Sequence, residues 1–247
     1  MKILFSPSEA KSDFKGPSTL HKNSFCFSNK FDERVSVLKK FTTFITNMSD
    51  DSLQKIFGIK DINECHKLRD IDLFTSFTCK AIKRYTGVAY KYLEFDTLQE
   101  KEKEFIQNNT IIFSNLFGPI LANDEIPYYK FKQGESIDGF KPEQFYKKKF
   151  SQELDDYIQD ELVIDLRAGF YEKFYKITQP YITMKFIKNG KVVSHWAKAY
   201  RGKVLRQLAK IQPNTIEEFE KINFDGLHVE EILIKGLNRQ YIFAIIE

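Results

Sequence analysis

The sequence predicts a mixed α+β fold, and three observations support this prediction. Short apolar runs that are typical of strands occur near the start, in the middle and near the end of the 247-residue chain. Longer stretches with helical periodicity lie between the early runs, whereas two hairpins dominate the end of the chain. This order of elements favours mixed α+β architecture over a repeated βαβ fold. We therefore expect a central sheet with late β-hairpins and surrounding helices.

Apolar runs bounded by polar residues predict the strands. Three early strands are expected at Ile3–Phe5, Ile111–Phe113 and Leu162–Ile164. Asn189-Gly190, a strong hairpin signal, separates two further strands, Ile182–Ile187 and Val192–His195. A second hairpin is expected to join two last runs, Val229–Ile234 and Tyr241–Ile246.

Periodicity also predicts six helices. They span Glu33–Asn47, Asp50–Phe57, Ile71–Tyr85, Thr97–Gln107, Pro142–Gln159 and Ala197–Ile211. Ser49 or Asp50 is expected to cap the second helix through its side-chain oxygen. Gly202 lies inside the last helix, where glycine costs about 0.5–1 kcal/mol relative to alanine. Its presence indicates close approach by another backbone or by a ligand.

Composition indicates a globular chain and excludes several classes of protein. The 24 phenylalanines and 12 tyrosines argue against disorder. No apolar stretch approaches membrane-spanning length, and the first apolar run is too short for a signal peptide, so we expect a cytoplasmic protein without a membrane partner. No repeat or linker marks a boundary, and residues 1–247 are therefore treated as a single domain.

Motif searches argue against familiar metal and catalytic sites. The three cysteines form no Cys-x-x-Cys pair, and the four histidines lack ligand spacing, so we expect neither a metal nor a cofactor. A P-loop, a dinucleotide fingerprint and a Gly-x-Ser-x-Gly elbow are also absent from the sequence. A hydrolase or nucleoside triphosphatase of a familiar type is therefore disfavoured.

Polar loops follow the three early strands, with the sequences SPSEAK, SNLFG and DLRAGFY. Ligands of open sheets bind outside the strand ends, where such loops converge. The residues that could share a cleft there are Ser6, Glu9, Lys11, Ser114, Asn115, Asp165 and Arg167. The alternative is that three turns merely follow three strands. Asp165 and Arg167 either form a structural ion pair or leave Arg167 free to bind a phosphate.

The stretch HWAKAYRGKVLRQLAK, residues 195–210, carries five basic residues and no acidic one. On a helical wheel, an apolar stripe that includes Tyr200 and Val204 faces away from Lys203, Arg206 and Lys210. This pattern is typical of an ordinary solvated helix, and a surface that holds a negatively charged ligand is the alternative.

Two glycine turns between expected helices offer further candidate anion sites. They are Phe57-Gly58-Ile59 and Tyr85-Thr86-Gly87, and the basic pair Lys83-Arg84 precedes the second. A turn of this kind can present backbone N–H groups to a phosphate, although glycine is common between helices.

Five segments, in this order, resemble the YaaA family, bacterial proteins associated with the peroxide stress response. They are SPSEAK, AIKRYTGVAY, SNLFGPILANDEIPYYKFKQG, VIDLRAGFY and AKAYRGKVLRQL. The resemblance implies a single mixed α+β domain with a positively charged cleft. It also implies DNA binding through that cleft and through a helix-hairpin-helix element, and a cytosolic role that limits oxidative damage. No established catalytic activity accompanies the resemblance.

The same segments indicate which residues match the basic positions of the family and where this chain departs from them. The matching residues are Lys11, Lys198, Arg201 and Arg206, with Arg167 in a variant DLR form. Asn115 stands where family members often have glycine, Leu121-Ala122 stand in place of an Arg-Pro pair, and Lys130 replaces an arginine. One expected cleft charge is thus lost and another becomes a point charge, which implies weaker or differently shaped DNA binding.

The leading hypothesis is a DNA-binding protein of the peroxide stress response that contacts phosphates without reading sequence. The residues expected to bind DNA phosphates are Lys11, Lys83, Arg84, Arg167, Lys198, Arg201, Lys203 and Arg206. The alternative is an enzyme acting on a nucleotide or a phosphorylated small molecule at the strand-end cleft. Polar and acid-base groups would come from Ser6, Glu9, Asp165 and Arg167, and Lys198 and Arg201 would hold the phosphate. Tight iron binding is not expected, and no protein partner is predicted.

Overall fold

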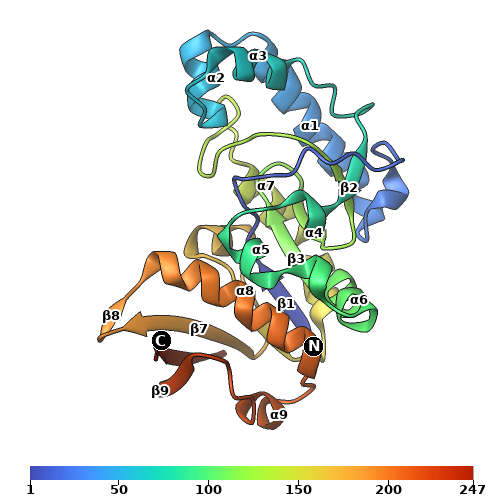
Figure 1. Cartoon of the computed structure of the whole chain (residues 1–247). Helices are drawn as coiled ribbons and strands as arrows, with labels where there is room; N and C mark the ends of the chain where they lie inside the picture. The colour runs from blue at the N-terminus through green and yellow to red at the C-terminus, as the bar shows by residue number, and fades with distance from the viewer. Residues whose placement is uncertain (247) are drawn as a thin grey trace.

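The computed structural model describes residues 1–246, apart from the side chains of Ser194 and His195, and its centre is an eight-stranded sheet (Figure 1). The strands follow the order β4-β3-β1-β6-β7-β10-β9, and β8 pairs with β7. Their bounds are β1 Lys2–Phe5, β3 Thr110–Ser114, β4 Gly118–Leu121, β6 Val163–Asp165, β7 Tyr181–Lys188, β8 Lys191–Val192, β9 Leu227–Lys235 and β10 Asn238–Ile245. A separate two-stranded sheet pairs β2 (Thr78–Lys80) with β5 (Glu125–Pro127).

Five neighbouring strands of the large sheet are parallel. β3, β1, β6, β7 and β10 run in one direction, whereas β4, β8 and β9 are antiparallel to their partners. Leu4 of β1 lies between Ile111 of β3 and Asp165 of β6. Both Leu4 and Ile111 are fully buried, as expected for parallel strands that are covered on both faces. The carboxyl ends of β1, β3 and β6 therefore meet at one edge of the sheet.

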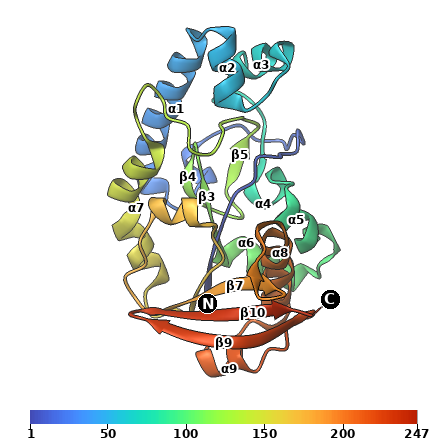
Figure 2. The same cartoon turned by 90° about the vertical axis from the view of Figure 1, so that its left-hand side faces the viewer.

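Helices cover both faces of this sheet. Their bounds are α1 Phe31–Thr46, α2 Asp50–Phe57, α3 Ile62–Arg69, α4 Ala81–Arg84, α5 Val88–Leu93, α6 Glu100–Asn109, α7 Pro142–Ile158, α8 Ser194–Ile211 and α9 Ile216–Glu220. Short 3-10 helices, η1 to η4, span Lys22–Ser24, Ser28–Lys30, Phe95–Thr97 and Gly169–Phe174. Figure 2 shows α7 on one side of β3 and β4, with α5, α6 and α8 on the other. In both views α2 and α3 lie at the end of the molecule away from α8 and α9.

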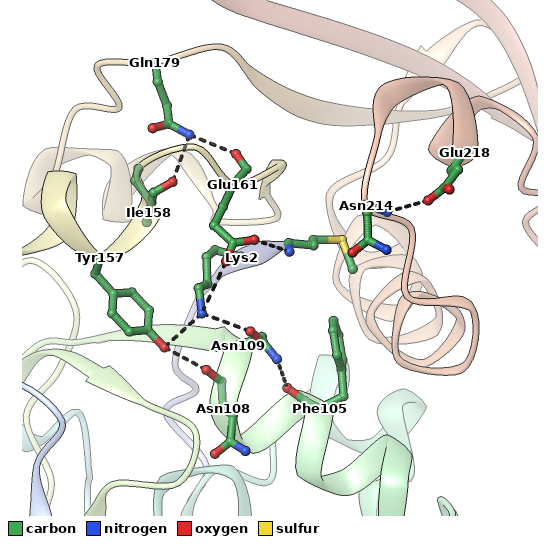
Figure 3. A network of polar contacts seen from close by, with 11 residues as sticks. Lys2, Phe105, Asn108, Asn109, Tyr157, Ile158, Glu161, Gln179, Asn214 and Glu218 are labelled. Carbon is green, nitrogen blue, oxygen red and sulfur yellow. Dashed lines mark hydrogen bonds and ion pairs between the residues drawn. The ribbon is translucent and has the colours of Figure 1, made fainter.

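A polar network fixes the amino-terminal edge of the sheet (Figure 3). The Lys2 ammonium donates to Asn109 Oδ1 at 3.0 Å and to the Tyr157 hydroxyl at 3.4 Å. Glu161 binds the Met1 amino group, and its carbonyl oxygen accepts from Gln179 Nε2 at 2.9 Å. These bonds join the start of β1 to the ends of α6 and α7. The loops that follow β1, β3 and β6 lie at the opposite, carboxyl ends of these strands.

The α+β prediction is confirmed, and two of the expected elements are wrong in part. The stretch expected as a helix at 71–85 contains β2 and only four helical residues, because the Thr78 backbone bonds to Ser18 and Gly16 and its strand pairs with β5. The strand expected at 192–195 ends at Val192, since α8 already begins at Ser194.

The expected side-chain cap of α2 is also wrong. Ser49 occupies the N-cap position, but its hydroxyl bonds to the Ser52 hydroxyl at 3.0 Å instead of a backbone N–H. The Asp50 carboxylate bonds to His66 of α3 at 2.8 Å. Both side chains therefore serve contacts within the helix pair α2–α3.

Candidate functional site

A pocket of about 270 Å³ lies at the carboxyl ends of β1 and β6. We call it the strand-end pocket. Its walls come from the loop after β1, the start of α5, the loop after β6 and the first turns of α8. The lining residues are 5–10, 87–90, Gln133, Leu166, Ala168, Tyr171, Lys198 and Arg201. The expected convergence of strand-end loops thus includes Ser6 and Glu9, together with two basic residues of α8.

The loop after β1 is held in place by bonds to the other walls. The Ser6 hydroxyl accepts from the Ala168 N–H at 2.8 Å, and the Ser6 carbonyl accepts from the Tyr90 hydroxyl at 2.8 Å. Ser8 Oγ accepts from the Gly87 N–H at 3.0 Å. A Cβ at Gly87 would lie 2.6 Å from Ser8 Cβ, so glycine is required for this approach. The pocket is therefore built before any ligand arrives.

α8 brings its basic residues to the pocket because its apolar stripe packs on the sheet. Tyr200 stacks on Phe186 of β7 with ring centroids 5.6 Å apart. Lys198 is exposed at the mouth of the pocket, and Arg201, three residues later, is half-buried. Burial lowers the pKa of Arg201, and the nearby carboxylates of Asp165 and Glu172 raise it.

Arg201 has donors that other groups can use. Within residues 1–246, no hydrogen bond or ion pair engages its guanidinium group. It also lines a second hollow of about 460 Å³, whose wall includes Asp165 and Glu172. A guanidinium with free N–H groups in a pocket wall is suited to bind phosphate in a forked geometry.

Because Gly202 has no side chain, α5 can pack closely against α8 beside these basic residues. A Cβ on Gly202 would overlap the Ala89 carbonyl oxygen and would lie 3.1 Å from the Leu93 nitrogen. The close approach expected from the sequence is thus an approach to the α5 backbone. Arg206 secures the other end of α5 by donating to the carbonyls of Leu93 and Glu94 at 2.9 and 3.0 Å. Arg206 is therefore a tether between helices and does not line the pocket.

Glu9 is the acidic residue that lines the pocket, and hydrogen bonds hold it in place. Glu9 Oε1 accepts from the Gln133 N–H at 2.8 Å, and the Glu9 carbonyl accepts from Lys130 Nζ at 3.0 Å. The pocket wall thus holds one carboxylate against Lys198 and Arg201.

Lys11 lies behind the pocket wall in a cluster of hydroxyl groups. Its ammonium donates to the Ser8 carbonyl at 3.1 Å and lies 4.4 Å from the Tyr129 ring centroid. The Tyr129 hydroxyl bonds to the Tyr85 hydroxyl at 2.9 Å and to Ser114 Oγ at 2.7 Å. Burial lowers the pKa of Lys11 to about 7, although Glu9 opposes this shift. Its amine is therefore partly deprotonated at neutral pH, which is the condition for a base or a nucleophile.

Replacing Lys11 by methionine is expected to stabilise the protein near pH 7. The unfolded chain keeps this proton up to the ordinary pKa of 10.5, whereas the folded protein loses it near 7. Between these values the unfolded state binds more protons, so the contribution of Lys11 to stability rises with pH. The advantage of Lys11→Met in urea denaturation should therefore be fully present below pH 7 and should shrink as the pH rises from 7 toward 10.5. Lys15→Met, at an exposed position of the same segment, is the control, and equal pH profiles for both variants would contradict the prediction.

Asp165 and Arg167 form the structural ion pair that the sequence left as one alternative. Arg167 Nε and Nη2 donate to the two carboxylate oxygens of Asp165 at 2.9 and 2.8 Å. Its third nitrogen donates to the carbonyls of Tyr171 and Tyr175 at 3.2 and 3.0 Å. Both side chains are buried, and these bonds engage four of the five N–H donors of Arg167, so it acts as a structural residue.

Other predicted ligands lie outside the strand-end pocket. Arg84 is fully buried and donates to the carbonyls of Phe14 at 3.0 Å and Ile126 at 3.2 Å, which corrects its assignment to a phosphate. Lys83 is on the surface with its ammonium 3.0 Å from Asp96. The Lys203 ammonium lies 4.8 Å from the Tyr200 ring centroid, and Lys203 does not line the pocket.

The turn after β3 is buried behind the pocket. Ser114 Oγ accepts from the N–H groups of Leu116 and Phe117 at 3.2 and 2.9 Å, and Asn115 Nδ2 donates to the Phe131 carbonyl at 3.3 Å. Ser114 and Asn115 therefore shape this turn and do not line the pocket. Gln133 and Tyr171 do line it; both lie in segments that resemble the family, but neither was expected as a site residue.

Both glycine turns use their N–H groups within the protein. Gly58 adopts a left-handed backbone conformation with φ 68° at the end of α2. Its N–H donates to the Gln54 carbonyl at 2.9 Å. Gly87 N–H is bound by Ser8, as described above. Among the side chains that the structure describes within residues 1–246, no three His, Cys, Asp or Glu residues are grouped to hold a metal ion. In the same part of the chain, no helix combines the length and the apolarity needed to cross a bilayer.

Comparison with known proteins finds similarity along the whole chain. A family model described as "Peroxide stress protein YaaA" matches residues 1–233. An uncharacterised protein of Campylobacter jejuni is 47% identical over 247 residues, which is the full length of both chains. A UPF0246 protein of Fusobacterium nucleatum is 30% identical over 250 residues, covering 94% of this chain and 95% of the relative. A UPF0246 protein of Corynebacterium glutamicum is 31% identical over 242 residues with the same coverage.

Proposed function

The chain belongs to the peroxide stress protein YaaA family, and from this premise we propose that it is a cytosolic protein that binds DNA phosphates without reading sequence. The observation that carries the proposal is the pair Lys198 and Arg201 at the strand-end pocket, where Arg201 keeps its donors free. No acidic residue lies on α8 to oppose this pair. Such contacts supply the electrostatic part of DNA affinity and carry no sequence information.

The size of the pocket decides how a duplex would lie. A volume of about 270 Å³ is at the lower limit of small-molecule sites and is far too small for double-stranded DNA. The duplex backbone would therefore lie across the mouth of the pocket, with one phosphate between Lys198 and Arg201. The carboxylate of Glu9, which also lines the pocket, would disfavour deeper entry of this phosphate.

The pair α2–α3 is the proposed helix-hairpin-helix-like element. Its two helices are joined through the exposed Gly58, and Lys55 and Lys60 are exposed on either side of this glycine. Because α2–α3 and α8 lie far apart (Figure 1), each would contact a different phosphate group along the backbone.

Charge removal at the pocket is expected to weaken duplex binding and its dependence on salt. Each phosphate contact contributes about −0.9 to the slope of log affinity against log salt. Because Lys198 and Arg201 share one phosphate, a Lys198→Gln/Arg201→Gln double variant should flatten the slope by about 0.9 in a fluorescence-anisotropy salt titration. The matched control is Lys101→Gln/Lys210→Gln, which removes two exposed charges elsewhere. Lys55→Gln/Lys60→Gln measures the share of α2–α3 in the same assay.

Two outcomes would oppose the proposal. Duplex binding that is independent of salt, or unchanged in the Lys198→Gln/Arg201→Gln variant, would exclude a phosphate site at this pocket. Thermal stabilisation by free nucleotides without any duplex binding would instead favour an enzyme acting on a phosphorylated small molecule. Lys11, with its pKa of about 7 behind the pocket wall, is the group that such an enzyme would use as a base.

A further inference from the structure

The last antiparallel strand of the large sheet has an open outer side. β9 pairs with β10, and no other strand within residues 1–246 pairs with β9. Figure 2 shows β9 at the margin of the sheet, below β10. All of its residues except Leu227 and Leu233 are exposed. An edge strand of nine residues presents unpaired N–H and C=O groups, which form a template for another strand.

The exposed side chains of this edge are unusually apolar. Ile232 is 43% exposed, Ile234 is 64% exposed, and Leu237 in the following turn is 49% exposed. Proteins usually protect long edges with proline, charge or a bulge. Here the register shift opposite Ile242 and Phe243 distorts only the first half of β9, and the segment Glu231–Lys235 is regular and carries one charge of each sign, Glu231 and Lys235. This half of the edge is therefore ready to pair.

We propose that β9 pairs in antiparallel fashion with β9 of a second copy of this chain, about a two-fold axis at Leu233. Residues that lie opposite each other in an antiparallel pair have their side chains on the same face of the sheet. The two-fold axis must therefore lie between the two copies of one residue, so that this residue faces itself. At Leu233, Glu231 lies opposite Lys235 of the second copy, and Ile232 lies opposite its Ile234. The axis repeats each pairing, which gives two ion pairs and two apolar pairs.

The facing of these residues agrees with the register inside one copy. Glu231, Leu233 and Lys235 pair with Ile242, Gln240 and Asn238 of β10, at steps of two, and thus share one face. Lys235 Nζ lies 3.4 Å from Gln240 Oε1, on this same face.

Neighbouring registers are less favourable. An axis at Glu231 would place two glutamates opposite each other, and like charges in this position are destabilising. An axis at Ile232 would place Glu230 opposite Ile234 and leave Lys235 opposite Val229. Charge complementarity therefore selects Leu233 as the axis and a second copy as the occupant of the edge.

Sedimentation velocity of the full chain tests the dimer. A single pair of strands buries less area than the roughly 1,200 Å² of a stable complex, so we expect a reversible dimer. The mass should move from 29.1 kDa toward twice that value as the concentration rises through the micromolar range. A mass that stays at one chain over this range would overturn the proposal.

Charge exchange tests the register. Glu231→Lys and Lys235→Glu, made separately, should each weaken association at least tenfold, because each places like charges opposite each other. The double variant Glu231→Lys/Lys235→Glu restores the opposite-charge pairs and should restore association. Glu230→Lys is the matched control, since in this register Glu230 lies opposite Gly236 and its replacement should change little. Dimers that withstand both single variants would show that association uses another surface. These residues are exposed and remote from the strand-end pocket, so the result is independent of DNA binding.

Discussion

A Gly202→Ala variant is expected to lose about 3 kcal/mol of unfolding free energy, the upper part of the range for overpacked interiors. The added Cβ would overlap the Ala89 carbonyl oxygen and would lie 2.9 Å from the carbonyl carbon and 3.1 Å from the Leu93 nitrogen. These are backbone atoms of α5, which cannot rotate away as a side chain can. Alanine gains about 1 kcal/mol in helix propensity, but the clash exceeds this gain.

Urea denaturation measures this effect, and Gly169→Ala provides the control. A Cβ at Gly169 would lie 3.8 Å from the nearest atom, Glu172 Oε1, which is an ordinary contact. Gly169→Ala should therefore change stability by no more than about 0.5 kcal/mol. Because α5 forms one wall of the strand-end pocket, Gly202→Ala should also weaken duplex binding at temperatures where the variant remains folded. Equal stability of the two variants would refute the backbone contact as the reason for glycine.

The sequence indicated the region of the pocket, where Ser6 and Glu9 of its seven candidate residues lie, because the strands beside it are buried on both faces. Such strands appear as short apolar runs, and the polar loops after them mark where the runs end. Adjacent parallel pairing of β1 with β3 and β6 then brings the three loop starts to one edge. Lys198 and Arg201 followed from their positions in a family segment, and their place at the pocket follows from the packing of α8.

The sequence could not distinguish a buried structural arginine from an arginine that binds a phosphate. Arg84 and Arg167 resemble phosphate ligands in sequence, because nothing local distinguishes a solvated guanidinium from one that binds carbonyl groups. The acceptors of Arg84 lie at Ser12, Phe14 and Ile126, far away along the chain. The strand β2 was missed for the same reason, since its pairing with β5 is a long-range contact.

Arg84→Met is expected to cost about 3 kcal/mol, because it removes a buried charged donor that binds the carbonyl groups of Ser12, Phe14 and Ile126, of which the Ile126 carbonyl is buried. The guanidinium is fully buried and joins the segment at Ser12 and Phe14, which continues from the pocket loop, to β5. Methionine fills much of the volume but donates no hydrogen bond. Urea denaturation measures the loss.

Lys83→Met, one residue earlier, separates this structural role from charge alone. Lys83 is exposed and pairs with Asp96 on the surface, so its replacement should cost less than about 1 kcal/mol. If Arg84→Met were no more destabilising than Lys83→Met, the three carbonyl bonds would not be what holds the segment. A large loss of stability in Arg84→Met, with the salt slope of DNA binding unchanged in molecules that remain folded, would show that Arg84 supports the pocket loop and leaves phosphate contact to Lys198 and Arg201. Such a result would also explain why a basic pair at this position is not by itself a DNA-binding signal.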